Sequence, residues 1–126
     1  MNNSLSLQEL ASLSQDAFLD IIQDIIFPTE NKLRIILKDK SFIDIFLSEK
    51  LLNGFSFHWE RSYQNNTIYR YDNYPDPNWE KVKTFPFHFH FQKENKVIAS
   101  PFSKTLPKVF VDFMEFVRQE IGEKAD

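Results

Sequence analysis

The chain has 126 residues, no cysteine, 14 phenylalanines and a formal net charge of -3. This length fits one domain with a core of its own, so we expect residues 1–126 to form a single domain. Without cysteine there is no disulfide framework and no thiolate chemistry, and the charge argues against broad nonspecific attraction to nucleic acid. The sequence has no signal-peptide pattern and no apolar run of membrane-spanning length. We therefore expect a cytoplasmic protein that does not engage membranes.

A helix is predicted close to the N-terminus. Ser6 and Glu9 have the spacing of a capping box, and apolar residues then recur at three- and four-residue steps as far as Pro28. This pattern predicts a helix over about Leu7–Phe27. Its apolar stripe must pack against a sheet or another helix.

From Lys32 onward the hydrophobic period changes from helical to two, which is typical of strands. Four such runs follow one another with short, turn-like connections: Lys32–Lys38, Phe42–Leu47, Phe55–Glu60 and Thr67–Asn73. Short connections between successive strands favour an antiparallel meander. The prolines after Asn73 predict a loop as far as Lys83, because proline removes a backbone donor.

Two further strands and a second helix complete the predicted fold. The Thr84–Phe91 segment alternates, and a short strand is expected over Val97–Ser100. Helical spacing returns from Leu106 to Ile121, with Pro107 suited to a first turn. We predict an α+β domain in which a twisted antiparallel sheet of four to six strands carries the N-terminal and C-terminal helices on one face.

The Thr84–Phe91 segment holds two of the three histidines, placed between phenylalanines. In a strand, His88 and His90 would share one face, because successive side chains point to opposite sides. Histidine titrates nearest to neutrality, so such a pair can transfer protons, bind metal or contact phosphate. We expect both imidazoles to approach the Arg70–Asn73 segment across the intervening loop.

A second group of polar side chains is predicted on the sheet face away from the helices. It comprises Arg34, Asp44, His58, Glu60, Arg70 and Asp72. In a meander, side chains directly opposite on neighbouring strands come within about 5 Å, so Asp44, His58 and Arg70 are expected to form a row. The row is either a polar site with acid, base and cation or a solvated face with paired charges.

Three interpretations of the histidine pair remain open from the residues alone. The pair could be half of a zinc site completed by His58 or Asp72, but the chain has few other ligands and we predict no metal and no cofactor. A metal-free alternative has a histidine or carboxylate moving a proton while Arg70 stabilises charge on phosphate. In the third, both imidazoles only bond the backbone and hold the preceding loop.

Aromatic residues offer a further nucleic-acid interpretation. Trp59, Tyr69, Tyr71 and Tyr74 could stack on bases, with Arg61 and Arg70 on phosphates. At strand spacing, however, aromatic side chains more often pack in a core or at a sheet edge. Asp72 or Asn73 would bond the backbone in a turn ahead of Pro75.

The order of these segments resembles the TumE-like family of small toxin proteins. The segments that carry the resemblance are SFIDIFL (41–47), FSFHWE (55–60), IYRYDNYP (68–75), TFPFHFH (84–90) and FMEFVRQEI (113–121). The most specific parts are the Arg-Tyr-Asp-Asn run from Arg70 and the Pro-x-His-x-His run from Pro86. Many relatives place a further histidine pair directly after the proline that follows the asparagine of the first run. In this chain that proline is Pro75, and Asp76 and Pro77 follow it.

The resemblance implies a toxin of a type II toxin–antitoxin pair. Its implied partner is a cognate antitoxin protein with a DNA-binding helix-turn-helix, and RNA is the expected target; a homodimer is also left open. We predict a metal-independent nuclease with His88 and His90 as proton-transfer groups, Arg70 as a phosphate contact and Asp72 as an orienting carboxylate. The substrate-binding candidates are Tyr71, Asn73, Trp59 and His58. The alternative is a noncatalytic protein-interaction module of the same fold.

Overall fold

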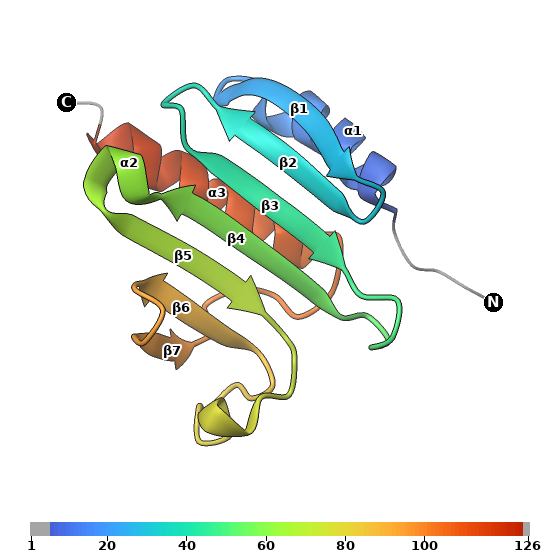
Figure 1. The fold of residues 1–126 in the computed structure, drawn as a ribbon, viewed down its shortest axis with the longest axis vertical. Coiled ribbons are helices and arrows are strands. Elements are labelled where there is room, and N and C mark those ends of the chain that lie inside the picture. Colours follow the sequence, from blue (N-terminus) through green and yellow to red (C-terminus); the bar gives the residue numbers. More distant parts are fainter. Residues whose placement is uncertain (1–5, 125–126) are drawn as a thin grey trace.

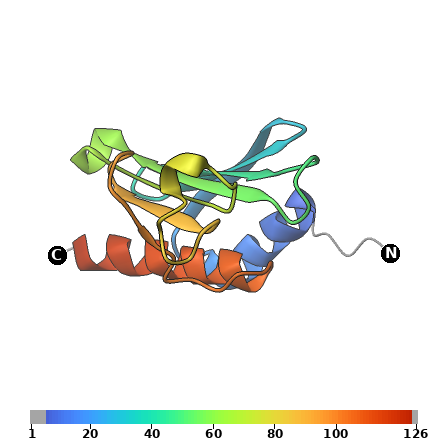
Figure 2. The ribbon, with the colours of Figure 1, turned by 90° about the horizontal axis from the view of Figure 1, so that it is seen from below.

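The computed structural model describes residues 6–124, which form a seven-stranded antiparallel sheet with two long helices on one face (Figures 1 and 2). The helices are α1 (Leu7–Phe18), the short α2 (Ser62–Asn65), the 3₁₀ turn η1 (Pro77–Trp79) and α3 (Lys108–Lys124). The strands are β1 (Ile22–Thr29), β2 (Lys32–Leu37), β3 (Phe42–Leu47), β4 (Phe55–Arg61), β5 (Thr67–Asp72), β6 (His88–Gln92) and β7 (Val97–Ala99). The predicted α+β class and the placement of both terminal helices on one face are confirmed.

The N-terminal helix is shorter than the sequence pattern predicts. The capping box is present, since Ser6 Oγ accepts from the Glu9 amide and Glu9 Oε1 from the Ser6 amide. However, the prediction of helix as far as Phe27 is wrong, because Ile22–Thr29 pairs with β2 as an edge strand. Isoleucines at three- and four-residue steps suit either state, and β-branched residues favour a strand. An edge strand also tolerates Pro28, where a ladder donor is missing.

The strands lie in the sheet in their chain order, from β1 to β7 (Figure 1). This confirms the antiparallel meander. The sheet has seven strands, whereas the prediction was four to six. The additional strand is β1, whose residues were assigned to the helix. Every connection therefore joins neighbours, and side chains that face one another across the sheet can be read from the register.

The core lies between the sheet and α3, and aromatic side chains dominate it. The inward residues of β4 are Phe55, Phe57 and Trp59, all buried. Phe57 meets Phe113 of α3 with ring centroids 5.3 Å apart. Burying one such aromatic side chain contributes on the order of 2–3 kcal/mol, so this layer fixes which sheet face turns inward.

Arg118 of α3 joins the two long helices. Its guanidinium donates to the Ala17 carbonyl at 2.5 Å and pairs with Asp20 at 2.8 Å, at the end of α1. It also lies over the Phe18 ring, 4.5 Å from the centroid. These contacts place the C-terminal end of α1 against α3 on one face of the sheet.

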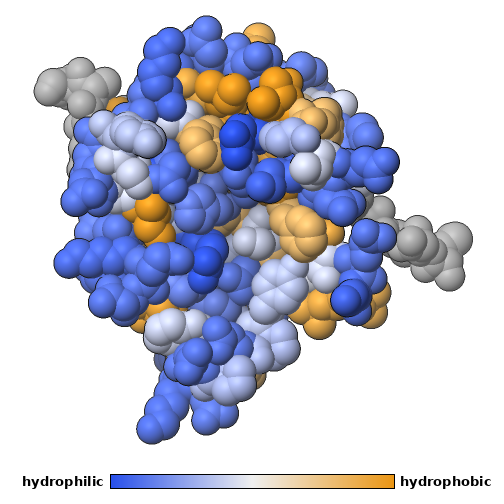
Figure 3. All heavy atoms as spheres, in the orientation of Figure 1, coloured by the Kyte–Doolittle hydropathy of each residue, from blue (hydrophilic) through white to orange (hydrophobic). Residues whose placement is uncertain are grey.

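Neither α1 nor α3 covers the other face of the sheet (Figures 1 and 2). Figure 3 shows that this face is mostly hydrophilic, with hydrophobic side chains gathered over β1 and β2. At the opposite edge, β6 and β7 bend toward α3 (Figure 2). Because the long helices lie on the opposite face, polar side chains on this uncovered face are free to form a site.

Among residues 6–124, no helix is both long enough and apolar enough to cross a bilayer.

Asp112 anchors the segment that leads into α3. Its carboxylate accepts from the Ser103 amide at 2.8 Å and hydroxyl at 2.5 Å, and it pairs with Lys108 at 3.2 Å. Partial burial tends to raise the pKa of Asp112, but the Ser103 hydrogen bonds and Lys108 outweigh it and lower the pKa below its usual value. The charged carboxylate therefore stabilises the folded chain.

An Asp112→Asn variant tests this anchor. Near neutral pH we expect its free energy of unfolding to fall by about 1 kcal/mol, because charge-assisted hydrogen bonds are lost. A lowered folded-state pKa stabilises above the unfolded value, about 3.9, and this contribution disappears as pH falls through the folded value. The gap between wild type and variant should therefore close in acid. Urea unfolding from neutral pH down to about pH 3 measures it, with exposed Asp16→Asn as control; a gap that stays constant would contradict the assignment.

Candidate functional site

The strand register builds a row of polar side chains across the uncovered face. Asp44 of β3 lies opposite His58 of β4, which lies opposite Arg70 of β5, so the predicted row is confirmed. The register extends it at both ends, to Arg34 of β2 and His90 of β6. Arg34 and Asp44 form a bidentate pair at 2.7 and 2.9 Å. The β2–β3 end of the row is therefore a neutralised surface ion pair.

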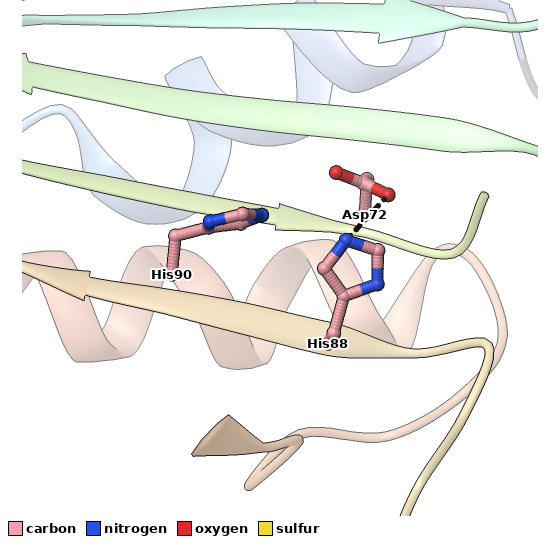
Figure 4. Close-up of side chains that lie close together, drawn as sticks. All are labelled: Asp72, His88 and His90. Carbon is pink, nitrogen blue, oxygen red and sulfur yellow. Dashed lines mark ion pairs between the residues drawn. The ribbon is translucent and has the colours of Figure 1, made fainter. Parts of the chain in front are cut away.

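A second row of side chains runs parallel to the first, two residues away along each strand, and places an aspartate beside His88. Asp72 of β5 lies opposite His88 of β6, and Arg70 lies opposite His90. Figure 4 shows both imidazoles projecting from β6 toward β5, on the side occupied by Asp72. We call Asp72, His88 and His90 the Asp–His cluster; all three are buried, and one ligand atom from each lies within 4.8 Å of the others. The expected approach of the histidines to β5 is confirmed.

His88 is hydrogen-bonded through both ring nitrogens. Its Nδ1 lies 2.9 Å from the Pro86 carbonyl, which can only accept, so Nδ1 carries a proton. Its Nε2 lies 3.2 Å from Asp72 Oδ1, the ion pair drawn in Figure 4. A hydrogen bond between these two atoms uses one proton, which either the imidazole or the carboxyl group can carry. His88 and Asp72 thus form one proton-holding unit.

His90 has the same orientation but a different neighbour. Its Nδ1 donates to the Glu94 carbonyl at 2.7 Å, and its Nε2 lies 3.3 Å from Arg70 Nη2. A guanidinium can only donate, so Nε2 of His90 must present its lone pair. Burial lowers the pKa of His90 and the Arg70 charge acts in the same direction, while contacts with Glu94 oppose them. The imidazole is accordingly held neutral.

Asp72 is a carboxyl group taken out of water. Its side chain is only 8% exposed, and burial raises its pKa, although His88, the Tyr74 amide and Arg70 act in the opposite direction. The Tyr74 amide donates to Oδ1 at 3.0 Å. Asp72 therefore holds a proton more readily than an exposed aspartate does.

Arg70 links the two halves of the site. Its Nε lies 3.7 Å from Asp72 Oδ2, and its Nη1 donates to the exposed Glu94 at 3.1 Å. Nε is buried without a hydrogen-bond partner among the described residues. The guanidinium, whose side chain is 35% exposed, thus retains donor capacity for a ligand such as an anion.

A hollow of about 310 Å³ opens beside this cluster. It is lined by Ser56, Arg70, Asp72, Tyr74, Asp76 and His88. Trp79, from η1, lies against both imidazoles, with ring centroids 6.4 Å from His88 and 5.7 Å from His90. A ligand in the hollow would reach His88 and Arg70, whereas His90 is not among the residues that line it.

The predicted substrate-binding residues occupy other positions. Trp59 and Tyr71 have no accessible surface and pack on the helix-covered face, so the structure places them in the core. Buried Asn73 accepts from the Phe55 amide at 3.0 Å and donates to the Asn53 carbonyl at 2.9 Å, which ties two loops together. His58 lies in the row but pairs with Glu60 at 3.1 Å. None of these four lines the hollow.

Sequence reasoning missed three contributors to the site. The Pro86 and Glu94 carbonyls set both imidazole orientations, yet any residue type can supply a carbonyl, so no sequence signal identifies them. The Glu94 carboxylate, which pairs with Arg70, has only its turn position four residues after His90 as a signal. Trp79 falls within the loop that the sequence predicts before Lys83, and nothing in the sequence around it indicates contact with the histidines.

Comparisons with known proteins identify the family. The model of the family described as Toxin TumE matches residues 11–121 of the chain. The match includes every strand and both residue runs that carry the site. No curated protein and no solved structure matches. The chain therefore belongs to the TumE toxin family.

Proposed function

We propose that this toxin-family protein cleaves RNA in the cytoplasm without a metal ion and is held in check by an antitoxin that carries a helix-turn-helix. Membership of the family implies a toxin function and suggests an antitoxin partner. The observation that supports RNA cleavage is the position of Arg70, whose guanidinium lies against the His88–Asp72 pair at an open hollow. Phosphoryl chemistry needs this combination of a fixed cation and a proton-holding group.

The hollow can receive a phosphodiester with Arg70 as its anion contact. An N–H of the Arg70 guanidinium, whose side chain is 35% exposed, would donate to a nonbridging oxygen and stabilise the charge that develops there. The 2′-oxygen of RNA would then attack phosphorus and release its proton to the His88–Asp72 unit. The bond from phosphorus to the 5′-oxygen breaks, and that oxygen receives a proton from the same unit. The products are a cyclic phosphate and a free 5′-hydroxyl.

The other two members of the cluster act through these groups. Asp72 holds His88 Nε2 and lies beside Arg70, so it orients both. His90 accepts from Arg70 and is covered by Trp79, which makes it a positioning residue rather than one that touches RNA. This assigns proton transfer to the His88–Asp72 unit and removes it from His90.

Basic residues next to the site supply local attraction for a polyanion. Lys81 and Lys83 line a second depression of about 530 Å³, together with Trp79. Lys93 and Lys96 are exposed in the turn between β6 and β7. Because phosphate contacts dominate RNA affinity, a local group of lysines is sufficient despite the net charge of -3.

The first test compares RNA cleavage and growth on induced expression. We expect wild type to arrest growth and cleave RNA with EDTA present. Arg70→Ala and His88→Asn should each lower the cleavage rate by about a hundredfold or more, because a charge contact or the proton carrier is lost. His90→Gln should lower the cleavage rate less than these two variants do, because the glutamine amide oxygen can still accept from Arg70.

His58→Ala is the matched control, because His58 lies on the same face and opposite Arg70 but does not line the hollow. It should cleave at the wild-type rate. Circular dichroism and thermal melts establish that each variant is folded. Growth arrest with intact RNA, or equal cleavage by folded Arg70→Ala and wild type, would contradict the nuclease proposal.

A second candidate function is that of a noncatalytic protein-interaction module. The observation favouring it is the outer edge of β1, which pairs with no other strand among residues 6–124 and where Ile26 and Phe27 are 38% and 44% exposed. Exposed apolar side chains beside an open edge offer both backbone and side-chain contacts to a partner strand.

This candidate predicts a different mutational pattern. Phe27→Ala should weaken co-purification with the product of the adjacent reading frame by about tenfold, because a buried aromatic contact contributes over 1 kcal/mol. Leu52→Ala is the control, since Leu52 is 85% exposed in the turn between β3 and β4. The His88→Asn variant should bind normally. Normal binding by Phe27→Ala would count against the β1 edge.

A further inference from the structure

We propose that Asp72, His88 and His90 form a binding site for a divalent transition-metal ion, with zinc as the best fit. The inference goes beyond the proposed RNA cleavage and does not require it. The three side chains come from two adjacent strands, β5 and β6, so a packed sheet positions them. All three are buried, and one donor atom from each lies within 4.8 Å of the other two.

The orientation of both imidazoles is the strongest support. Each Nδ1 is bonded to a backbone carbonyl, His88 to Pro86 at 2.9 Å and His90 to Glu94 at 2.7 Å. Histidines that bind metal usually donate their second ring N–H to a carbonyl or carboxylate, which fixes the tautomer. Both Nε2 atoms are therefore turned toward the same space as the Asp72 carboxylate (Figure 4).

The spacing is close to that of a tetrahedral ion. Bond lengths of about 2.0–2.1 Å place tetrahedral zinc ligands about 3.3 Å apart. His88 Nε2 and Asp72 Oδ1 are already 3.2 Å apart, and small side-chain rotations would bring His90 inward. Three protein ligands leave a fourth position, and the hollow lined by Asp72 and His88 gives an entry path for the ion and water.

The ligand types select among metals. Two imidazoles and one carboxylate suit zinc and its transition-metal neighbours, whereas magnesium and calcium prefer oxygen ligands. One group opposes the ion: Arg70 Nη2 lies 3.3 Å from His90 Nε2. Its Nη1 already pairs with exposed Glu94, so the guanidinium can turn toward solvent and keep that partner.

The ion and the proposed proton transfer use the same atoms. A metal on His88 Nε2 and Asp72 removes the proton that they share. We therefore place the ion in competition with the metal-independent reaction rather than within it.

Isothermal titration of untagged, EDTA-stripped full-length protein with zinc chloride tests the site. We expect one zinc per chain with micromolar or tighter affinity and no heat with magnesium chloride. Asp72→Asn and His90→Ala should each weaken zinc binding at least tenfold, because each removes a ligand. Cobalt(II) should give the visible absorption of a tetrahedral ion, which these variants lose.

His58→Ala is again the matched control, since it removes the third histidine without touching the cluster. It should bind zinc as wild type does. Thermal melts identify variants that fail to fold, and Asp72→Asn preserves the side-chain shape if His90→Ala does not fold. The inference is overturned if stripped wild type binds no zinc, or if His58→Ala loses binding while folded Asp72→Asn retains it.

The zinc titration and the RNA assay test the two proposals independently. A protein that binds zinc at the cluster and cleaves no RNA would contradict the proposed function and leave the metal site standing. Conversely, cleavage in EDTA by a protein that binds no zinc would uphold the proposed function alone.

Discussion

Burial of one sheet face against α3 is the constraint on which the rest of the structure depends. Phe57 and Trp59 turn inward on β4, so His58 between them must turn outward. Because side chains alternate with a period of two, a slip of one residue would move the aromatic residues into water and the polar rows into the core. The hydrophobic effect thus fixes the register, and the register fixes which polar groups meet. The site is a consequence of the core on the opposite face.

Backbone carbonyls orient the two histidines alike, and the neighbour of Nε2 distinguishes them. Both imidazoles are oriented by a carbonyl on Nδ1, yet Nε2 of His88 faces a carboxyl group and that of His90 faces a guanidinium. One ring consequently shares a proton with Asp72, and the other is held neutral. Two residues of one type, two positions apart on one strand, therefore have different hydrogen-bond partners. The same arrangement leaves both Nε2 atoms available to a cation when Arg70 turns away.

The loop between β5 and β6 contributes to the site through Asp76 and Trp79. Here Asp76 accepts from the Asn78 amide and caps η1, and it also lines the hollow. The cap positions η1, and with it Trp79 over the histidine pair. Through Trp79 the loop therefore covers part of the Asp–His cluster.

The sequence by itself determined six of the seven strands, the presence of a helix near each end, the order of these strands in the meander, and the approach of His88 and His90 to Arg70 and Asp72. These follow from local alternation and short connections, which act over a few residues. It did not determine whether Ile22–Thr29 is helix or strand, because the isoleucine spacing fits both and only pairing with β2 decides. Only the tertiary structure placed Trp59 and Tyr71 in the core, Trp79 over the histidines and two carbonyls behind them. The core contacts join segments far apart in the chain, and burial selects them. The two carbonyls lie only two and four residues from their histidines, but any residue type supplies the same acceptor, so no sequence signal marks them.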